Sequence, residues 1–219
     1  MEDRRRIDAT LAKGKGIIFV SAHIANWELL AMGMAAHGFP TAIVVKRMSS
    51  ALSQSLIELQ RKKTGLEIIY AGGTIEKMRA ALAQGKIIGF MMDQNITGKK
   101  GIRCNFFGVP ASSIRALGAL ARDSGAAVIP ICAFRREDGK LQVHLEADLP
   151  YLEAKGLDPE ERNLREEWLN AQQYQTAIEA MVRLHPDQWL WIHRRWKARR
   201  DSLQSETAHH ENREGASVR

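Results

Sequence analysis

The 219-residue sequence has few of the features that mark secreted or membrane-spanning proteins. Its two cysteines, Cys104 and Cys132, are too few for a disulfide framework and suit a reducing compartment. No window approaches the roughly 18 uninterrupted apolar residues that a membrane span requires. The charged stretch 1–6 has no apolar segment behind it of the kind that forms a secretory signal. We therefore expect any membrane contact to be made from the surface, or through a segment outside this sequence.

The sequence also lacks the ligand spacing of a catalytic zinc site. The H-E-x-x-H pattern needs two histidines four residues apart on one helix, and no such pair is present. We therefore expect neither a bound metal nor a cofactor.

Bulk composition indicates one globular domain with a basic surface. The apolar fraction of 45% excludes a disordered chain, and the length suits a single α/β domain. The formal charge of +7 favours an acidic partner. That partner could be an anionic membrane surface, a phosphorylated lipid, an acidic carrier protein or nucleic acid.

Strand-like and helix-like segments alternate along the chain, which predicts a mainly parallel, mixed sheet flanked by helices. One antiparallel element is expected after the Asp-Gly turn at 138–139. A polar loop is expected at 93–110, a domain at 1–200 and a disordered polar tail at 201–219. Strands are expected at 16–22, 42–46, 66–70, 87–92, 127–134 and 141–147, and helices at 26–37, 51–63, 74–84, 112–124 and 162–184.

The pair His23 and Glu28 is the strongest candidate for chemistry. It follows the first strand, and five helical steps of about 100° would put the two side chains on nearly opposite faces. They can meet only if His23 lies on the turn and Glu28 in the first turns of the helix. There the carboxylate would fix the imidazole tautomer, as in catalytic triads.

Two further clusters end strands that we expect to lie in the same sheet. Lys46 and Arg47 follow the second strand, and 93–95 (Asp-Gln-Asn) follow the fourth. Function gathers at the carboxyl ends of parallel strands, so the three clusters support one another. Asp93 could brace an arginine or the active-site loop, or only cap a turn. Arg61 could likewise be ordinary helix surface.

Five segments in order resemble the bacterial lipid A (lauroyl/myristoyl) acyltransferase family of the lysophospholipid acyltransferase superfamily. The first is H-x4-E at 23–28, and the second joins Lys46-Arg47 and Ser-Ser-Ala-Leu at 49–52 with a later Arg61. The others are Asp93-Gln94 with 105–111, Val-Ile-Pro at 128–130, and the run HPDQWLWIHRRWK at 185–197. The resemblance implies a glycerolipid acyltransferase-like α/β fold. Only 22 residues precede His23, so we expect the family's usual N-terminal membrane helix to be missing.

The resemblance also implies a reaction. An acyl thioester, on acyl carrier protein or coenzyme A, would donate its chain to a hydroxyl of a lipid A precursor or related anionic glycolipid. His23 would be the general base, Glu28 its orienting partner, and Lys46, Arg47, Arg61 and Asp93 substrate or oxyanion candidates. The two cysteines would be packing residues. The protein would work peripherally at the cytoplasmic face of the bacterial inner membrane.

Indoles and basic side chains alternate near the end of the chain. Arg194, Arg195 and Lys197 are candidates for lipid-phosphate or membrane contacts. Such a segment could also bind single-stranded nucleic acid, but that hypothesis leaves His23 and Glu28 unexplained, and we expect no nucleic-acid partner. A non-catalytic relative that binds lipid or acyl carrier protein is the other alternative.

Overall fold

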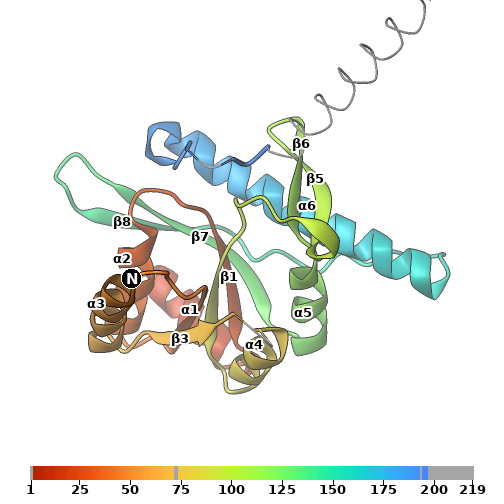
Figure 1. Cartoon of the computed structure of the whole chain (residues 1–219). Helices are drawn as coiled ribbons and strands as arrows, with labels where there is room; N and C mark the ends of the chain where they lie inside the picture. Colours follow the sequence, from red (N-terminus) through yellow and green to blue (C-terminus); the bar gives the residue numbers. More distant parts are fainter. Residues whose placement is uncertain (1, 72–73, 193, 197–219) are drawn as a thin grey trace, which may run out of the picture.

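The structure is a computed structural model that describes residues 2–71, 74–192 and 194–196 (Figure 1). Two predictions concern residues outside the described part of the chain: the lipid contact at Lys197 and the polar tail at 201–219.

A six-stranded sheet forms the centre of the molecule, with strand order β3-β2-β4-β1-β7-β8. Neighbouring strands are parallel except β7 and β8, which pair antiparallel. The predicted mainly parallel sheet with one antiparallel element is therefore confirmed. The strands are β1 (Ile17–Ser21), β2 (Thr41–Val45), β3 (Glu67–Tyr70), β4 (Ile87–Met91), β7 (Ala127–Arg135) and β8 (Leu141–Leu145).

Helices cover both faces of the sheet, and the alternation of side chains along β1 explains how. Ile17 and Phe19 pack with α1 (Glu2–Leu11) and α2 (Trp27–Ala36). Ile18 and Val20 point the other way, into a core shared with α4 (Thr74–Ala83), α5 (Ala116–Ser124) and α6 (Pro159–Leu184). Figure 1 shows α6 crossing the molecule, with α3 (Ala51–Lys63) far from the start of α6. All the helices expected from the sequence are present, and α1 is an addition.

The predicted loop at 93–110 is wrong, because most of it folds as a hairpin. After η1 (Gly98–Lys100), β5 (Gly101–Phe106) pairs antiparallel with β6 (Val109–Ile114). Phe107 and Gly108 form its two-residue turn with φ of 52° and 73°, the positive values of a type I′ turn. Phe-Gly is not the usual Asn-Gly signal, so the sequence does not predict this turn. The helix expected from residue 112 consequently starts only at Ala116.

Within the described residues, no helix has both the length and the apolar composition needed to cross a bilayer. Helix α6 has 26 residues, but charged side chains recur along it. A short helical turn, η2 (Pro186–Gln188), follows α6 and leads the chain back towards the end of β1, where Leu190 N–H donates to the His23 carbonyl at 2.9 Å.

Candidate active site

A tight turn between β1 and α2 presents His23. Asn26 caps α2 by accepting a hydrogen bond from the Leu29 N–H at 3.0 Å. Ala25 has a φ of 45°, which is uncommon for a residue with a Cβ, and its N–H donates to the Gln188 carbonyl at 2.8 Å. His23 therefore lies on the turn and Glu28 in the first helical turn, as the sequence predicted.

Asp93 holds the imidazole. It lies two residues after the end of β4, the strand that pairs with β1. The carboxylate accepts from His23 Nδ1 through Oδ1 and from the His23 backbone N–H through Oδ2, each at 2.8 Å. The Trp189 indole N–H donates to Oδ2 at 2.9 Å. A carboxylate can only accept, so in the neutral ring Nδ1 carries the proton and Nε2 has the lone pair. This is the tautomer that a general base acting through Nε2 requires.

The environment keeps Asp93 ionised. The side chain is fully buried, and this burial by itself raises the pKa of Asp93. The hydrogen bonds from His23 and from the Trp189 indole N–H lower the pKa of Asp93 by more, so the net shift is below the usual value. Asp93 is thus a buried anion whose contacts are with the His23 turn; of the roles left open by the sequence, these contacts favour bracing of the active-site loop.

Glu28 binds Arg61 instead of serving as the acceptor for His23 Nδ1. Its two carboxylate oxygens accept from Arg61 Nε at 2.6 Å and from the terminal Nη2 at 2.9 Å, a bidentate ion pair. The sequence assigned the orienting contact to Glu28, and the structure gives the Nδ1 hydrogen bond to Asp93. The reason is topological: β1 and β4 are adjacent, so Asp93 reaches the imidazole from the end of the neighbouring strand, while Glu28 pairs with Arg61 of α3.

Arg61 is not ordinary helix surface. It is only 8% exposed and is the one buried residue of α3. Its hydrogen bonds with Glu28 raise the pKa of Arg61 above the usual value, against the opposing effect of burial. The ion pair therefore joins α3 to the first turn of α2.

We expect Arg61→Met to loosen α3 locally, because no other side chain of this helix is buried. Hydrogen exchange of the α3 amides should speed up by about tenfold or more, while the β1 amides stay protected. Glu28→Gln should have the same effect, and the double variant should be no worse than either single one. Equal acceleration in β1 would show global destabilisation instead.

An apolar cavity of about 430 Å³ opens beside His23. The sheet and α2 form its walls, and polar side chains join the lining. Because Gln94 lines this cavity and its Nε2 lies 3.4 Å from His23 Nε2, the basic nitrogen is on the cavity side. Apolar walls come from Phe19, Leu30, Met34, Ile43, Phe90 and Ile131, and polar groups from His23, Glu28, Lys46, Arg61 and Gln94.

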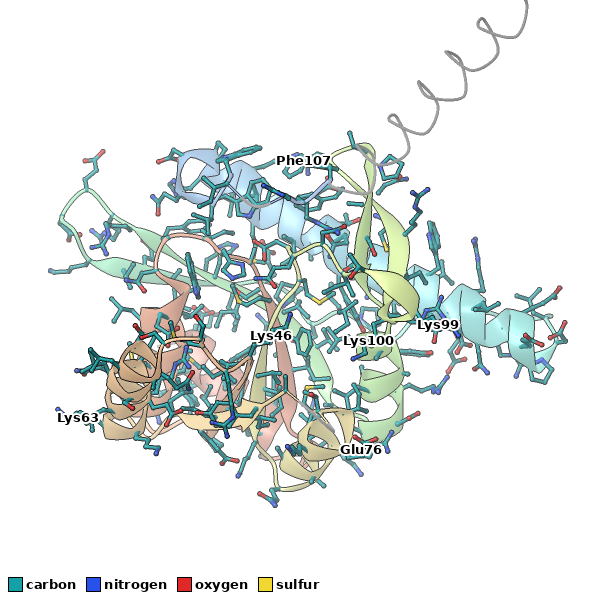
Figure 2. All side chains as sticks on the ribbon, viewed as in Figure 1. Lys46, Lys63, Glu76, Lys99, Lys100 and Phe107 are labelled. Atoms are coloured by element: carbon teal, nitrogen blue, oxygen red, sulfur yellow. The ribbon has the colours of Figure 1, made fainter. Side chains whose placement is uncertain are left out.

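The two basic residues after β2 separate in the structure. Lys46 lines the cavity, whereas Arg47 is not one of the described residues that line it. The Arg47 guanidinium instead lies 4.0 Å from the centre of the Tyr70 ring, a cation–π contact. Figure 2 shows Lys46 near the middle of the molecule in this view. Of these two neighbours, Lys46 is therefore the one at the cavity, and its contact with a ligand stays a prediction.

The proposed lipid contact at Arg195 is wrong, since its side chain is completely buried. Its guanidinium donates to the Gln94 and Ser112 carbonyls and to Gln175 Oε1, and lies over the Phe106 ring at 5.0 Å. Burial lowers the pKa of Arg195 to about 10, so it stays charged at neutral pH. Arg194 next to it is exposed and remains a candidate contact.

Arg195→Met is expected to lower the free energy of unfolding by about 3 kcal/mol or more. Gln175 Oε1 is a buried acceptor, and leaving it without a donor costs about 1–3 kcal/mol; the part-buried carbonyls of Gln94 and Ser112 lose their Arg195 hydrogen bonds as well. The matched control is Arg194→Met at the exposed neighbouring position, which should change stability by less than about 0.5 kcal/mol. Denaturant unfolding of both variants measures the difference, and equal stabilities would contradict the bridging role.

Two of the three indoles at 189–196 turn inward. Trp189 is 4% exposed and Trp196 is half-buried, with its indole N–H donating to the Phe106 carbonyl at 3.2 Å. Trp191 is exposed. Burial removes Trp189 and Arg195 from the surface of this segment, whereas Trp191 and Arg194 stay exposed on it.

Both cysteines are free and buried, as the packing hypothesis predicted. Desolvation raises the pKa of Cys104 to about 11 and that of Cys132 to about 12. Neither thiol is therefore a nucleophile at neutral pH.

Two members of the site carry only a weak signal in the sequence. Gln94 belongs to the cluster after β4, but nothing in the sequence gives its amide a particular role. The sequence pattern around Trp189 indicates an interface residue, because indoles with arginines suit lipid boundaries. Its contact with Asp93 spans 96 residues, and nothing local in the sequence predicts such a contact.

Fold and site together define a class of protein: an α/β domain in which a histidine, oriented by a buried carboxylate, lines an apolar cavity. Residues 1–198 match the family described as bacterial lipid A biosynthesis acyltransferase, and the chain belongs to this family of acyltransferases. The resemblance drawn from the sequence motifs is confirmed.

Curated relatives agree with this membership at modest identity. The chain is 27% identical over 148 residues to phosphatidylinositol mannoside acyltransferase of Mycobacterium tuberculosis, covering 65% of this chain and 46% of the relative. It is 27% identical over 201 residues to lipid A biosynthesis lauroyltransferase of Escherichia coli, covering 89% of this chain and 60% of the relative. It is 23% identical over 198 residues to lipid A biosynthesis acyltransferase of Haemophilus influenzae, covering 89% of this chain and 58% of the relative. The chain thus spans about half to three-fifths of the length of these relatives.

Proposed function

We propose that this protein transfers a fatty acyl chain from a thioester, on acyl carrier protein or coenzyme A, to a hydroxyl of a lipid A precursor or related anionic glycolipid. The observation that carries the proposal is the position of His23. Its Nε2 lies beside the apolar cavity while its Nδ1 is held by a buried carboxylate. The cavity would take the acyl chain, and family membership supports the reaction type.

In this mechanism, His23 Nε2 removes the proton from the acceptor hydroxyl as its oxygen attacks the thioester carbonyl carbon. The new C–O bond gives a tetrahedral intermediate with a negative oxygen. When the intermediate collapses, the C–S bond breaks and the thiolate leaves. The imidazolium returns its proton to that sulfur. Asp93 orients His23 and stabilises its charged form throughout.

Lys46 is the donor to the oxyanion in this proposal. It lines the cavity, whereas Arg61 is engaged by Glu28 and Arg47 stacks on Tyr70. A cation at that position would act where charge develops in the transition state. The Glu28–Arg61 pair would then shape the cavity wall and not take part in proton transfer.

The first test is transfer from radiolabelled acyl-acyl carrier protein and from acyl-coenzyme A by the purified chain. A Kdo-lipid A precursor and a phosphatidylinositol mannoside, each in detergent, serve as separate acceptors, with His23→Ala as the inactive control. Product formed only with intact His23 supports the proposal and identifies the donor and the acceptor. Binding of acyl carrier protein or lipid by a folded chain without turnover would favour the non-catalytic alternative.

Work at the cytoplasmic face of the inner membrane is part of the same proposal. The cytoplasmic leaflet is anionic, and a basic protein of +7 formal charge would be attracted to acceptor lipids there.

A further inference from the structure

Helix α3 carries its apolar side chains on the outside. Leu52, Leu56 and Leu59 are 71%, 57% and 50% exposed, and their spacing of four and three residues places them on one face. Arg61 is nine residues after Leu52, about 180° around the helix, and it is the buried one. The helix is thus oriented by an inward ion pair, with its leucines left to solvent.

This exposed row is more than scattered surface hydrophobicity. Met48, in the loop that leads into α3, is 49% exposed and extends the apolar set. Single exposed leucines are common on soluble proteins, but contiguous apolar patches mark surfaces that bind a partner or a membrane. We call Met48, Leu52, Leu56 and Leu59 the α3 apolar patch.

The charges of α3 favour an anionic partner for this patch. The helix ends in Arg61, Lys62 and Lys63, and the Lys62 side chain is 71% exposed. Figure 2 shows Lys63 at the outer edge of the molecule, on α3. The single acid of the helix, Glu58, accepts hydrogen bonds from Tyr70 and Gln54, which lower its pKa, and its other oxygen lies 3.8 Å from the exposed Lys62 Nζ. Leucines on one face with lysines at its end are typical of helices that lie in a membrane interface.

The patch also lies close to the cavity. Arg61 of α3 and Lys46, two residues before Met48, both line it. A helix is about 10 Å across, so a bilayer under α3 would lie within roughly that distance of the cavity wall. A lipid acceptor could then approach His23 without leaving the membrane region.

We propose that α3 docks this protein on an anionic bilayer, with the α3 apolar patch among the acyl chains and Lys62 and Lys63 at the lipid phosphates. The proposal rests on the proposed function only in taking a membrane lipid as acceptor. Docking through this face orients the cavity towards the lipid surface.

Flotation with vesicles tests the docking without any catalysis. The probe is vesicles of equal parts phosphatidylglycerol and phosphatidylcholine, compared with phosphatidylcholine alone. The chain should float with the anionic vesicles, and Leu52→Ser/Leu56→Ser/Leu59→Ser should reduce its partition by about tenfold or more, because binding scales with buried apolar area. The matched control is Leu164→Ser/Leu184→Ser, two leucines of α6 that are each 51% exposed, and it should float like the parent. Equal loss in both variants would overturn the assignment to α3.

A fluorescent label identifies what covers the patch. An environment-sensitive dye on Leu56→Cys should brighten with anionic vesicles, whereas one on Leu164→Cys should not. The two native thiols are buried with raised pKa values, so the introduced cysteine takes the label. Brightening that follows protein concentration without vesicles would mean that a second copy covers the patch, and no change at all would also overturn the proposal.

An activity comparison separates this inference from the proposed function. The triple serine variant should keep transfer to acceptor in detergent and lose most transfer to acceptor in vesicles. Flotation without transfer by the parent chain under either condition would leave docking standing and the proposed reaction wrong. Transfer in vesicles that does not depend on the three leucines would overturn the docking role alone.

Discussion

His23→Ala is expected to lower the rate of acyl transfer by about 10²–10⁴-fold, the usual contribution of a positioned general base. The substitution removes Nε2, the nitrogen on the cavity side of the ring. The measurement is single-turnover transfer under saturating donor, so that binding and product release do not mask the chemical step. A variant with normal single-turnover rates would exclude His23 as the base.

Stability has to be controlled in that experiment. Although His23 lies on a turn, its imidazole is the partner of Asp93 Oδ1, and the Asp93 side chain is fully buried. An unpartnered buried acceptor costs about 1–3 kcal/mol, so His23→Ala should also unfold at lower denaturant. Rates are therefore compared at equal folded fractions.

Asp93→Asn is expected to lower the rate by about 10³–10⁴-fold, although its shape is almost unchanged. Two N–H groups, from the His23 backbone and Trp189, already point at Oδ2, so the asparagine oxygen must take that position. Its NH₂ group then faces His23 Nδ1 and donates to it. The ring proton is forced onto Nε2, and the base is lost while the geometry survives.

The double variant and a pH series check this reasoning. His23→Ala/Asp93→Asn should be no slower than His23→Ala alone, since the two residues act as one unit. Because the folded-state pKa of Asp93 is depressed, its contribution to stability is present above the unfolded value of about 3.8 and is lost as pH falls through the lower folded value. The stability advantage of the parent over Asp93→Asn should therefore shrink below about pH 3.8. Additive rate losses would show that Asp93 acts elsewhere than on His23.

Local patterns are enough to predict most of the architecture. Short apolar runs alternate with helical periodicity, and β1, β2, β4 and β7 appear where these runs lie. The same patterns put His23 and Asp93 at the carboxyl ends of their strands, which is why the amino-acid order alone makes both of them candidates. The hairpin β5–β6 is not predicted because Phe-Gly is an unusual type I′ turn. Helix α1 is not predicted because a strongly charged segment gives little apolar periodicity.

The sequence by itself therefore determined the fold class, the family and the residues worth testing. Only the tertiary structure decided which of them pair. Strand order made Asp93, 70 residues from His23, its hydrogen-bond partner, and left the nearer Glu28 to hold Arg61. Packing likewise turned Arg195 and Trp189 inward and left the α3 leucines outside. The physical reason is common to all these cases: spacing fixes which way a side chain leaves its own element, but the neighbour it meets there is supplied by a distant part of the chain.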